Sequence, residues 1–437
     1  MKRFLASLAG ILALCTGSAR AIPLRVQAPV MSSYSGAKIV TQREIANPLA
    51  GMYLFVRAGL DRQTPHQNGL AALVAQCILQ TPVAGRPLND ALLAQGGSVN
   101  FTMDGRWIRF YVEGVSANFG SGILPLFESA LAKPDFSVAN IAAARAELQR
   151  HIAEEEKIPL DVGMQMLNSS FYADSDAGLP AYGLPGTLAG FTGDDAAKFY
   201  AAYYRRGGAL VSADGGLDAV TDARLSRVLD TLPAGVTQAA KVQLGKGSFS
   251  GRHLITHRDV SAPWLVAQFR APSIDSPDFG SMLVLASFLE RTTAEVAENP
   301  SITTKPLAQR AVGTIYNFDE RPASVVLYIN GGFGDPSRPF NTALSVIQIF
   351  ARSKVTGDLA GMKSMAAGSY LDEAGNLDDR AWLAGVFAMQ NVPPDYVGRG
   401  LNAIAAVRPA DLQRVARKYF DNPNVAVVLP RDAPSPY

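Results

Sequence analysis

The stretch from Gly69 to Cys77 reads GLAALVAQC and decides how the rest of the chain is interpreted. It follows a strand-like run, Met52–Ala58, and a polar loop. Small and apolar residues fill almost every position, which predicts the first turns of a buried helix. Residues three and four apart lie on one face of such a helix.

The N-terminus has the pattern of an export signal. Lys2 and Arg3 precede an apolar run, Phe4–Thr16, and Ala19–Ala21 has the small-x-small form of a cleavage site. Residues 1–21 are therefore predicted to be a signal peptide, and the protein is expected to be periplasmic or secreted. No other run approaches the roughly 20 apolar residues that span a bilayer. No integral membrane segment is expected after cleavage.

The composition excludes several classes of partner. The chain has 437 residues, of which 48% are hydrophobic and 18% charged, and its formal net charge is +2. Removing the signal peptide would remove three positive charges and leave a nearly neutral chain, so neither nucleic acid nor an acidic membrane is an expected partner. Cys77 would be the one remaining cysteine, which excludes an intrachain disulfide.

Three pairs of segments resemble each other at nearly constant separation, 213 residues for the first pair and 216 for the other two. The pairs are Leu54–Ala58 with Ala267–Ala271, Gly97–Phe101 with Gly313–Asn317, and Tyr203 plus Ala209–Val211 with Tyr419 plus Val425–Val427. This period is far too long for a solenoid, and it predicts two tandem copies of one domain of about 200 residues.

The predicted fold class is α+β, with helices packed on a mainly antiparallel sheet in each of two homologous domains. Alternating runs such as Trp107–Val112 and Ser324–Ile329 indicate strands. The segments with helical periodicity and capping residues are Ser116–Ala132, Ser137–Glu155, Asp194–Arg205 and Ala410–Phe420. The predicted domains span residues 22–232 and 251–437, and a linker rich in Gly, Ala, Ser and Gln joins them at 233–250.

The stretch that begins at Gly69 resembles G-L-A-H-L-L-E-H-M, the zinc motif of insulinase/pitrilysin-type peptidases. The chain as a whole is similar to their two-domain form, of which mitochondrial processing peptidase is an example. The Gly96-Gly97 turn, the helix around 144–151, the helix–strand ending Tyr419–Val428 and the internal repeat also fit this resemblance. It implies a half-clamshell of two homologous domains that, with a second half, encloses unfolded peptides.

The resemblance fails at the metal ligands. The two His ligands of the H-x-x-E-H signature correspond to Ala72 and Gln76, and its catalytic Glu corresponds to Ala75. The family's third ligand, a Glu in a stretch like E-R-x-V-x-L-x-E, corresponds to His151. Alanine has no donor atom and an amide is a poor zinc ligand, so no metal and no cofactor are expected in this chain. Without a general base at position 75, it is not expected to cleave peptides alone.

A second family pattern, R-E-x-x-G-L-A-Y, implies an Arg and a Tyr that hold the substrate carbonyl. Here Gly313 and Tyr316 fit the pattern, while Gln309 occupies the Arg position and Arg310 follows it. The resemblance thus implies Tyr316 and Arg310 as substrate-binding residues. Whether Gln309 or Arg310 faces the chamber stays open, and an ordinary surface Arg with a half-buried strand Tyr is the alternative.

Other histidines do not form a metal site by spacing. His253 and His257 belong to an alternating, strand-like run, and on a strand they would lie about 13 Å apart. His66 is expected in a solvated loop.

Three functional hypotheses follow from these residues. The first is a non-catalytic subunit that pairs with a zinc-bearing homologue, encloses polypeptide substrates and leaves the zinc to its partner. The second is a self-contained peptide-binding or scaffold protein, alone or as a homodimer, which holds extended peptides at a sheet edge. The third, an active metalloendopeptidase with a rebuilt site that uses His151 and His66, has the least support.

Overall fold

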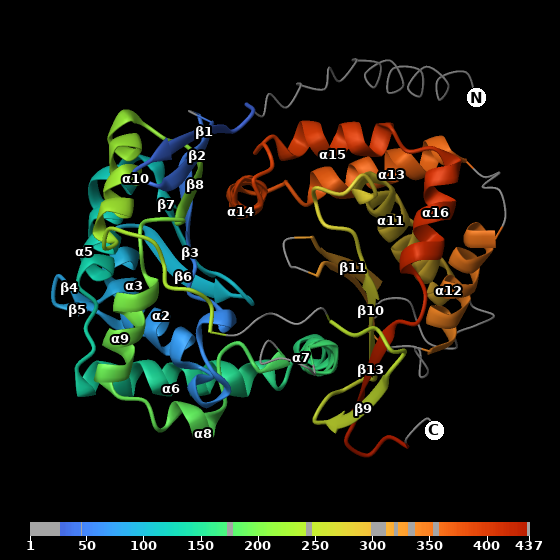
Figure 1. The fold of residues 1–437 in the computed structure, drawn as a ribbon, viewed down its shortest axis with the longest axis horizontal. Coiled ribbons are helices and arrows are strands. Elements are labelled where there is room, and N and C mark those ends of the chain that lie inside the picture. Colours follow the sequence, from blue (N-terminus) through green and yellow to red (C-terminus); the bar gives the residue numbers. More distant parts are fainter. Residues whose placement is uncertain are drawn as a thin grey trace, which may run out of the picture.

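The computed structural model describes residues 27–44, 46–172, 178–241, 247–298, 312–318, 322–330, 337–352 and 358–434. The predicted signal peptide, Gln309 and Arg310 lie outside these residues. Figure 1 shows two halves, each with its own sheet and its own outer layer of helices, facing each other across the middle of the molecule. Among the described helices, none has the length and apolar character needed to span a membrane.

The first sheet has six strands in the order β1-β2-β8-β3-β7-β6. In that order they span Val30–Tyr34, Ala37–Arg43, Leu210–Gly215, Leu49–Val56, Ile108–Val115 and Gly97–Met103. Only β2 and β8 are parallel, and the other neighbours are antiparallel. Central β3 is buried on both faces, whereas edge strand β6 alternates between buried and exposed residues. This contrast is expected of a sheet whose centre is covered on both sides and whose edge is covered on one.

The second sheet repeats this arrangement with five strands in the order β11-β12-β10-β13-β9. In that order they span Val312–Asn317, Ser324–Asn330, Trp264–Arg270, Asn424–Pro430 and His253–Arg258. Here too one pair, β13 with β9, is parallel. The segments that resemble each other in sequence occupy equivalent strands, with β3 matching β10, β6 matching β11 and β8 matching β13. The α+β prediction is confirmed, with the addition that both sheets are mixed.

Helices cover the outer face of each sheet. In the first half they are α2 Leu70–Gln80, α3 Leu88–Leu93, α4 Ser116–Asn118, α5 Leu124–Ala132, α6 Val138–Glu155, α8 Pro185–Leu188, α9 Gly193–Tyr203 and α10 Ala219–Thr231. In the second half they are α11 Phe279–Glu298, α12 Ser337–Arg352, α13 Leu359–Asp372, α15 Tyr396–Ala405 and α16 Pro409–Tyr419. The short pieces are η1 Leu60–Arg62, η2 Pro65–Gln67, η3 Phe119–Ile123, β4 Pro82–Val83 and β5 Arg86–Pro87.

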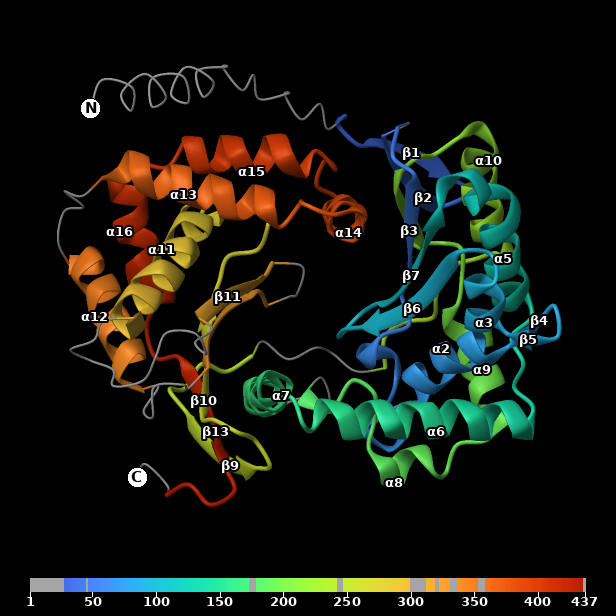
Figure 2. The same cartoon turned by 180° about the vertical axis from the view of Figure 1, so that it is seen from behind.

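Two helices cross between the halves. α7, Pro159–Phe171, belongs to the first half by sequence but packs on β10 and β13 of the second sheet, where Leu167 joins Val266 and Ala426 in a small core. α14, Leu377–Met389, belongs to the second half but packs on β3 and β8 of the first sheet. Figures 1 and 2 show both helices between the two halves. Each sheet is therefore covered on its inner face by a helix from the other half.

Directional polar contacts fasten α14 to the first sheet. Arg380 Nε lies 2.5 Å from Oδ2 of Asp214, a carboxylate with 1% exposure on β8. The Tyr53 hydroxyl on β3 donates to Oδ1 of Asp378. Gly385 allows the close approach, because a Cβ there would lie 2.4 Å from Cε2 of Phe55. The two faces of β3 consequently belong to two different hydrophobic cores, one on each side.

Candidate functional site

The helix α2 is intact but carries no chemical groups at two of the three expected positions. It starts after Gly69, whose φ of +94° is left-handed and whose missing Cβ makes room for Gly183 and Leu188. Ala72 and Ala75 are both 0% exposed and belong to the first core. Their methyl groups pack in that core and offer no ligand or base.

The other two predicted positions, Gln76 and His151, lie at the same cavity. Gln76 of α2 and His151 of α6 line one cavity of about 380 Å³. The sequence interpretation, which assigned both residues to one former metal site, is consistent with this placement. Ala72 and Ala75 are not among the cavity's lining residues. The other lining residues come from the end of α2, the region around α3, the strand β6 and α6, and they are Leu79, Gln80, Pro87, Asn89, Asp90, Val99, Asn100, Phe101, Glu147, Leu148 and Tyr182.

His151 is already engaged by its neighbours. Its Nε2 lies 3.3 Å from Oε1 of Glu155, one turn further along α6. Its ring packs edge-on against Tyr182, with centroids 4.4 Å apart. Hydrogen bonding to Glu155 raises the pKa of His151 despite partial burial, which favours the protonated form.

The donor set therefore does not fit zinc. Two methyl groups, one amide and one carboxylate-paired imidazole stand where three metal ligands and a general base would be needed. Within the part of the chain that the structure describes, no group of three His, Cys, Asp or Glu side chains is arranged to hold a metal ion. His253 and His257 lie on the strand β9, as predicted, and His66 lies exposed in η2.

The edge of β6 beside this cavity is open for pairing. Among the described strands, β6 has β7 as its one neighbour in the sheet, and Val99, Asn100 and Phe101 line the cavity. The amide N–H of Val99 points outward, since it donates to Oδ1 of Asn89 at 3.4 Å. In an antiparallel ladder the outward groups alternate, so Phe101 and Met103 also direct their backbone N–H and C=O towards the open edge. An extended peptide could add to these groups as a seventh strand.

Tyr316 is buried in the second half. It lies on β11 with 8% exposure, and its hydroxyl donates to the backbone oxygen of Pro272 at 2.5 Å. Its ring packs against Phe279 and Phe318. Burial raises the pKa of Tyr316 well above its ordinary value. The predicted pairing with Arg310 falls outside the described residues, so the substrate-binding role of both residues stays a prediction.

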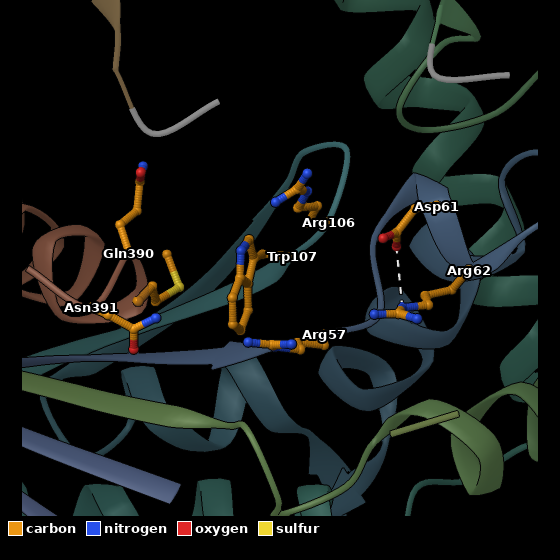
Figure 3. A pocket seen from close by; sticks show the side chains of 8 residues that line it. Arg57, Asp61, Arg62, Arg106, Trp107, Gln390 and Asn391 are labelled. Atoms are coloured by element: carbon orange, nitrogen blue, oxygen red, sulfur yellow. Dashed lines mark ion pairs between the residues drawn. The ribbon is translucent and has the colours of Figure 1, made fainter. Parts of the chain in front are cut away.

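A second polar cavity contains residues that sequence reasoning missed. It has a volume of about 200 Å³ and is shown in Figure 3. Its lining comes from the end of β3, from η1, from the β6–β7 turn and from the C-terminal end of α14, and comprises Arg57, Asp61, Arg62, Arg106, Trp107, Met389, Gln390 and Asn391. We call it the arginine pocket. The run DGRW at 104–107, in which an Arg and a Trp stand at the tip of a hairpin, is the sequence signal that could have indicated it.

Comparison with known proteins identifies the fold. No family model matches the sequence, and no curated protein matches it. The structure is similar to an inactive domain of peptidase M16 from Pseudomonas fluorescens, with a TM-score of 0.76 and 16% identity over 94% of this chain and 100% of that chain. It is also similar to a protease from Helicobacter pylori, with a TM-score of 0.76 and 15% identity over 92% and 100% of the two chains.

A chain of complex III2 from Candida albicans matches with a TM-score of 0.69 and 13% identity, over 91% of this chain and 95% of that chain. At such identities the likeness establishes the fold alone. This chain has the M16 peptidase fold, which confirms the insulinase/pitrilysin resemblance drawn from Gly69–Cys77 and the internal repeat.

Proposed function

We propose that this chain, which has the M16 peptidase fold, is a non-catalytic subunit that pairs with a zinc-bearing homologue. The observation that carries the proposal is the state of α2. The helix keeps its length, its left-handed glycine start and its burial, while Ala72, Ala75 and Gln76 hold the chemical positions. The helix that would carry the zinc ligands and the general base is present, but those side chains are not. This is expected if a second, related chain supplies the zinc site.

The residues around α2 support the absence of activity in the isolated chain. Hydrolysis by an M16-type site needs a base that deprotonates a metal-bound water, and position 75 holds a methyl group in the core. Of the titratable groups that line the cavity next to Gln76, His151 is paired with Glu155 and Glu147 with Arg150.

The fold supports a role in enclosing peptides. The two halves face each other with their crossing helices between them, which suits one wall of a chamber (Figure 2). Similar folds occur in a domain described as inactive and in a chain of a complex, so the fold is compatible with both properties. The partner is expected in the periplasm or outside the cell, where the N-terminal sequence would send this chain.

A self-contained peptide-binding protein is the second candidate, and one observation favours it. The open edge of β6 runs along the cavity that Gln76 and His151 line, so a peptide could bind there without any partner. Binding of peptides is common to both candidates, and they differ in whether a second, zinc-bearing chain completes the chamber.

The test is recovery of the tagged full chain from its native cells, with identification of the proteins that accompany it. A stoichiometric partner of similar size with an intact H-x-x-E-H is the expected result. The purified pair should then hydrolyse casein-derived peptides, whereas this chain alone should not. Recovery of the chain by itself or as a homodimer would overturn the subunit proposal and leave the peptide-binding candidate.

Two further measurements refine this test. Tyr316→Phe in the reconstituted pair asks whether this chain lends a substrate-binding group. If the hydroxyl serves only its bond to Pro272, turnover should be unchanged while thermal stability falls. Zinc content of the purified chain, measured by mass spectrometry of the metal, addresses the third hypothesis, because stoichiometric zinc in this chain alone would revive an active peptidase.

A further inference from the structure

The arginine pocket has an excess of positive charge. Asp61 offsets Arg62, whose Nε lies 3.2 Å from the carboxylate oxygen Oδ1. Among the described residues, no carboxylate forms an ion pair with Arg57 or Arg106, and both side chains are exposed to the cavity's opening. Arg57 lies over the ring of Trp107, with its guanidinium carbon 5.1 Å from the ring centroid.

The nearby acid does not cancel this excess. Asp104 accepts hydrogen bonds from the backbone N–H groups of Arg106 and Trp107 and lies 3.4 Å from Arg109. Its charge is thus directed at the turn and at Arg109. Burial, together with the like charges of Arg62 and Arg106, lowers the pKa of Arg57. Two guanidinium groups are consequently held at one cavity at an electrostatic cost that a bound anion would relieve.

The floor of the pocket is built from buried polar groups. Asp61 and Arg62 are 6% and 8% exposed, and Arg62 Nη1 donates to the backbone oxygen of Gln238 at 2.8 Å. Oδ1 of Asp61 and Nε of Arg62 are both buried, and each has the other as its ion-pair partner, without good hydrogen-bond geometry. Figure 3 shows this pair to the right of Arg106, Trp107 and Arg57.

The pocket lies at the end of the open strand. β6 ends at Met103, the turn 104–107 follows, and the register pairs Met103 with Ile108 and Ile108 with Val56. This register brings Arg57 next to Trp107. A peptide paired along β6 from Val99 to Met103 would cover about 13 Å and arrive at the turn that lines the pocket.

We propose that the arginine pocket binds the C-terminal carboxylate of an extended peptide whose preceding residues pair with β6. This inference rests on the proposed peptide-binding function and adds a polarity and an end-group preference to it. A guanidinium group donates two parallel hydrogen bonds to a carboxylate. Trp107 would supply apolar surface for the last side chain. A free inorganic anion such as phosphate shares the same chemistry and is distinguished by experiment.

The experiment uses the full mature chain and a pool of ten-residue peptides with acetylated N-termini and uncharged, randomised side chains. The pool is made twice, once with a free C-terminal carboxylate and once as the amide, and the two are mixed in equal amounts. The immobilised chain is incubated with the mixture, and the retained peptides are counted by mass spectrometry. The free acids should be retained about tenfold more than the amides, as a charged, bidentate contact would give.

Arg106→Gln and Arg57→Gln are the test variants, and Arg86→Gln in the distant β4–β5 hairpin is the matched control. The two test variants should remove most of the preference, and the control should keep it. Circular dichroism and thermal unfolding show whether each variant retains the fold. If one test variant is unstable, a double variant with Lys in place of both Arg57 and Arg106 replaces it. This double variant keeps the positive charges and should keep part of the preference for free acids.

The outcomes separate the inference from the function on which it rests. Retention of acids and amides in equal amounts would overturn the carboxylate pocket and leave peptide binding standing. Retention of no peptides would overturn both. If calorimetry with inorganic phosphate gave binding that depends on Arg57 and Arg106 while the peptides showed no preference, the pocket would bind a free anion and the peptide assignment would be wrong.

Discussion

Two helices lie on opposite faces of the strand β3, and they are held there in different ways. α2 packs mainly by apolar burial, with small residues at Ala72 and Ala75, and Asn140 of α6 donates a hydrogen bond to its Cys77 backbone oxygen. α14 arrives from the other half of the chain and is fastened by Arg380, by Asp378 and by the close approach at Gly385. One face of β3 is therefore covered mainly by apolar contacts, while the face that joins the two halves also has directional polar contacts.

The largest effect is expected when a carboxylate is introduced into the apolar packing of α2. Ala75→Glu should lower the free energy of unfolding by about 4 kcal/mol, because the side chain is fully buried and does not line the cavity. Chemical denaturation measures this. Gln76→Glu, which borders the cavity, is the control and should change stability by less than about 1 kcal/mol. Equal effects at the two positions would show that Ala75 faces open space.

Removing the ion pair that holds α14 on the first sheet should cause the next largest loss of stability. Arg380→Leu leaves the buried carboxylate of Asp214 without its partner and should lower the free energy of unfolding by about 3 kcal/mol. Burial already raises the pKa of Asp214, so the loss should be greatest at neutral pH and should shrink as the pH falls and the carboxyl becomes protonated. Arg150→Leu, which removes the exposed pairs with Glu147 and Glu154 on α6, should change the free energy of unfolding far less.

A glycine pair tests how tightly α14 is seated. Gly385→Ala would place a methyl group 2.4 Å from the ring of Phe55 and should cost about 1–2 kcal/mol through overpacking. Gly368→Ala in α13 meets no atom within 4 Å and should stabilise the protein by about 0.5–1 kcal/mol through helix propensity. Opposite signs in thermal unfolding would confirm the close joint, whereas stabilisation by both substitutions would contradict it.

The smallest effect concerns the arginine pocket. Burial raises the pKa of Asp61 to about 6, against the lowering influence of Arg62, Arg106 and Arg57 and with a raising contribution from Asp104. A peptide carboxylate stays ionised well below that pH, since its ordinary pKa is about 3.5. As the pH falls from 7.5 to 5.5, Asp61 loses its negative charge, so the affinity for free-acid peptides should rise about threefold.

Calorimetry across this pH range tests the expectation. Asp61→Asn should give a nearly flat profile, because the group that titrates has been removed. An affinity of the unmodified chain that falls on acidification would contradict the assignment of Asp61 to the pocket.

Much of the fold could be predicted because its strands and helices follow local sequence patterns. The alternating run at Ser324–Ile329 became β12, and the capped segment Ser137–Glu155 became α6 with one residue of difference. The internal repeat correctly indicated two related sheets, since equivalent segments occupy equivalent strands. His253 and His257 were correctly assigned to a strand by the alternating pattern of the run that contains them.

What could not be predicted depends on contacts between distant segments. α7 and α14 look like ordinary amphipathic helices of their own halves, and nothing local in their sequences shows that they pack on the opposite sheets. The arginine pocket unites Arg57 with Trp107 through strand register, which a single sequence does not show. That Gln76 and His151 lie at one cavity could be predicted only through the family resemblance.

The crossed helices have a consequence for how the chain is made. The inner face of the first sheet exposes Tyr53, Phe55 and Leu210 until residues 377–389 have been synthesised. At 5–20 residues per second, that interval is roughly 10–30 s after β8 leaves the ribosome. During this time the apolar inner face of the first sheet is exposed, and the chain can aggregate unless a chaperone binds this face. Covering of the first sheet therefore depends on a helix that is synthesised much later in the chain.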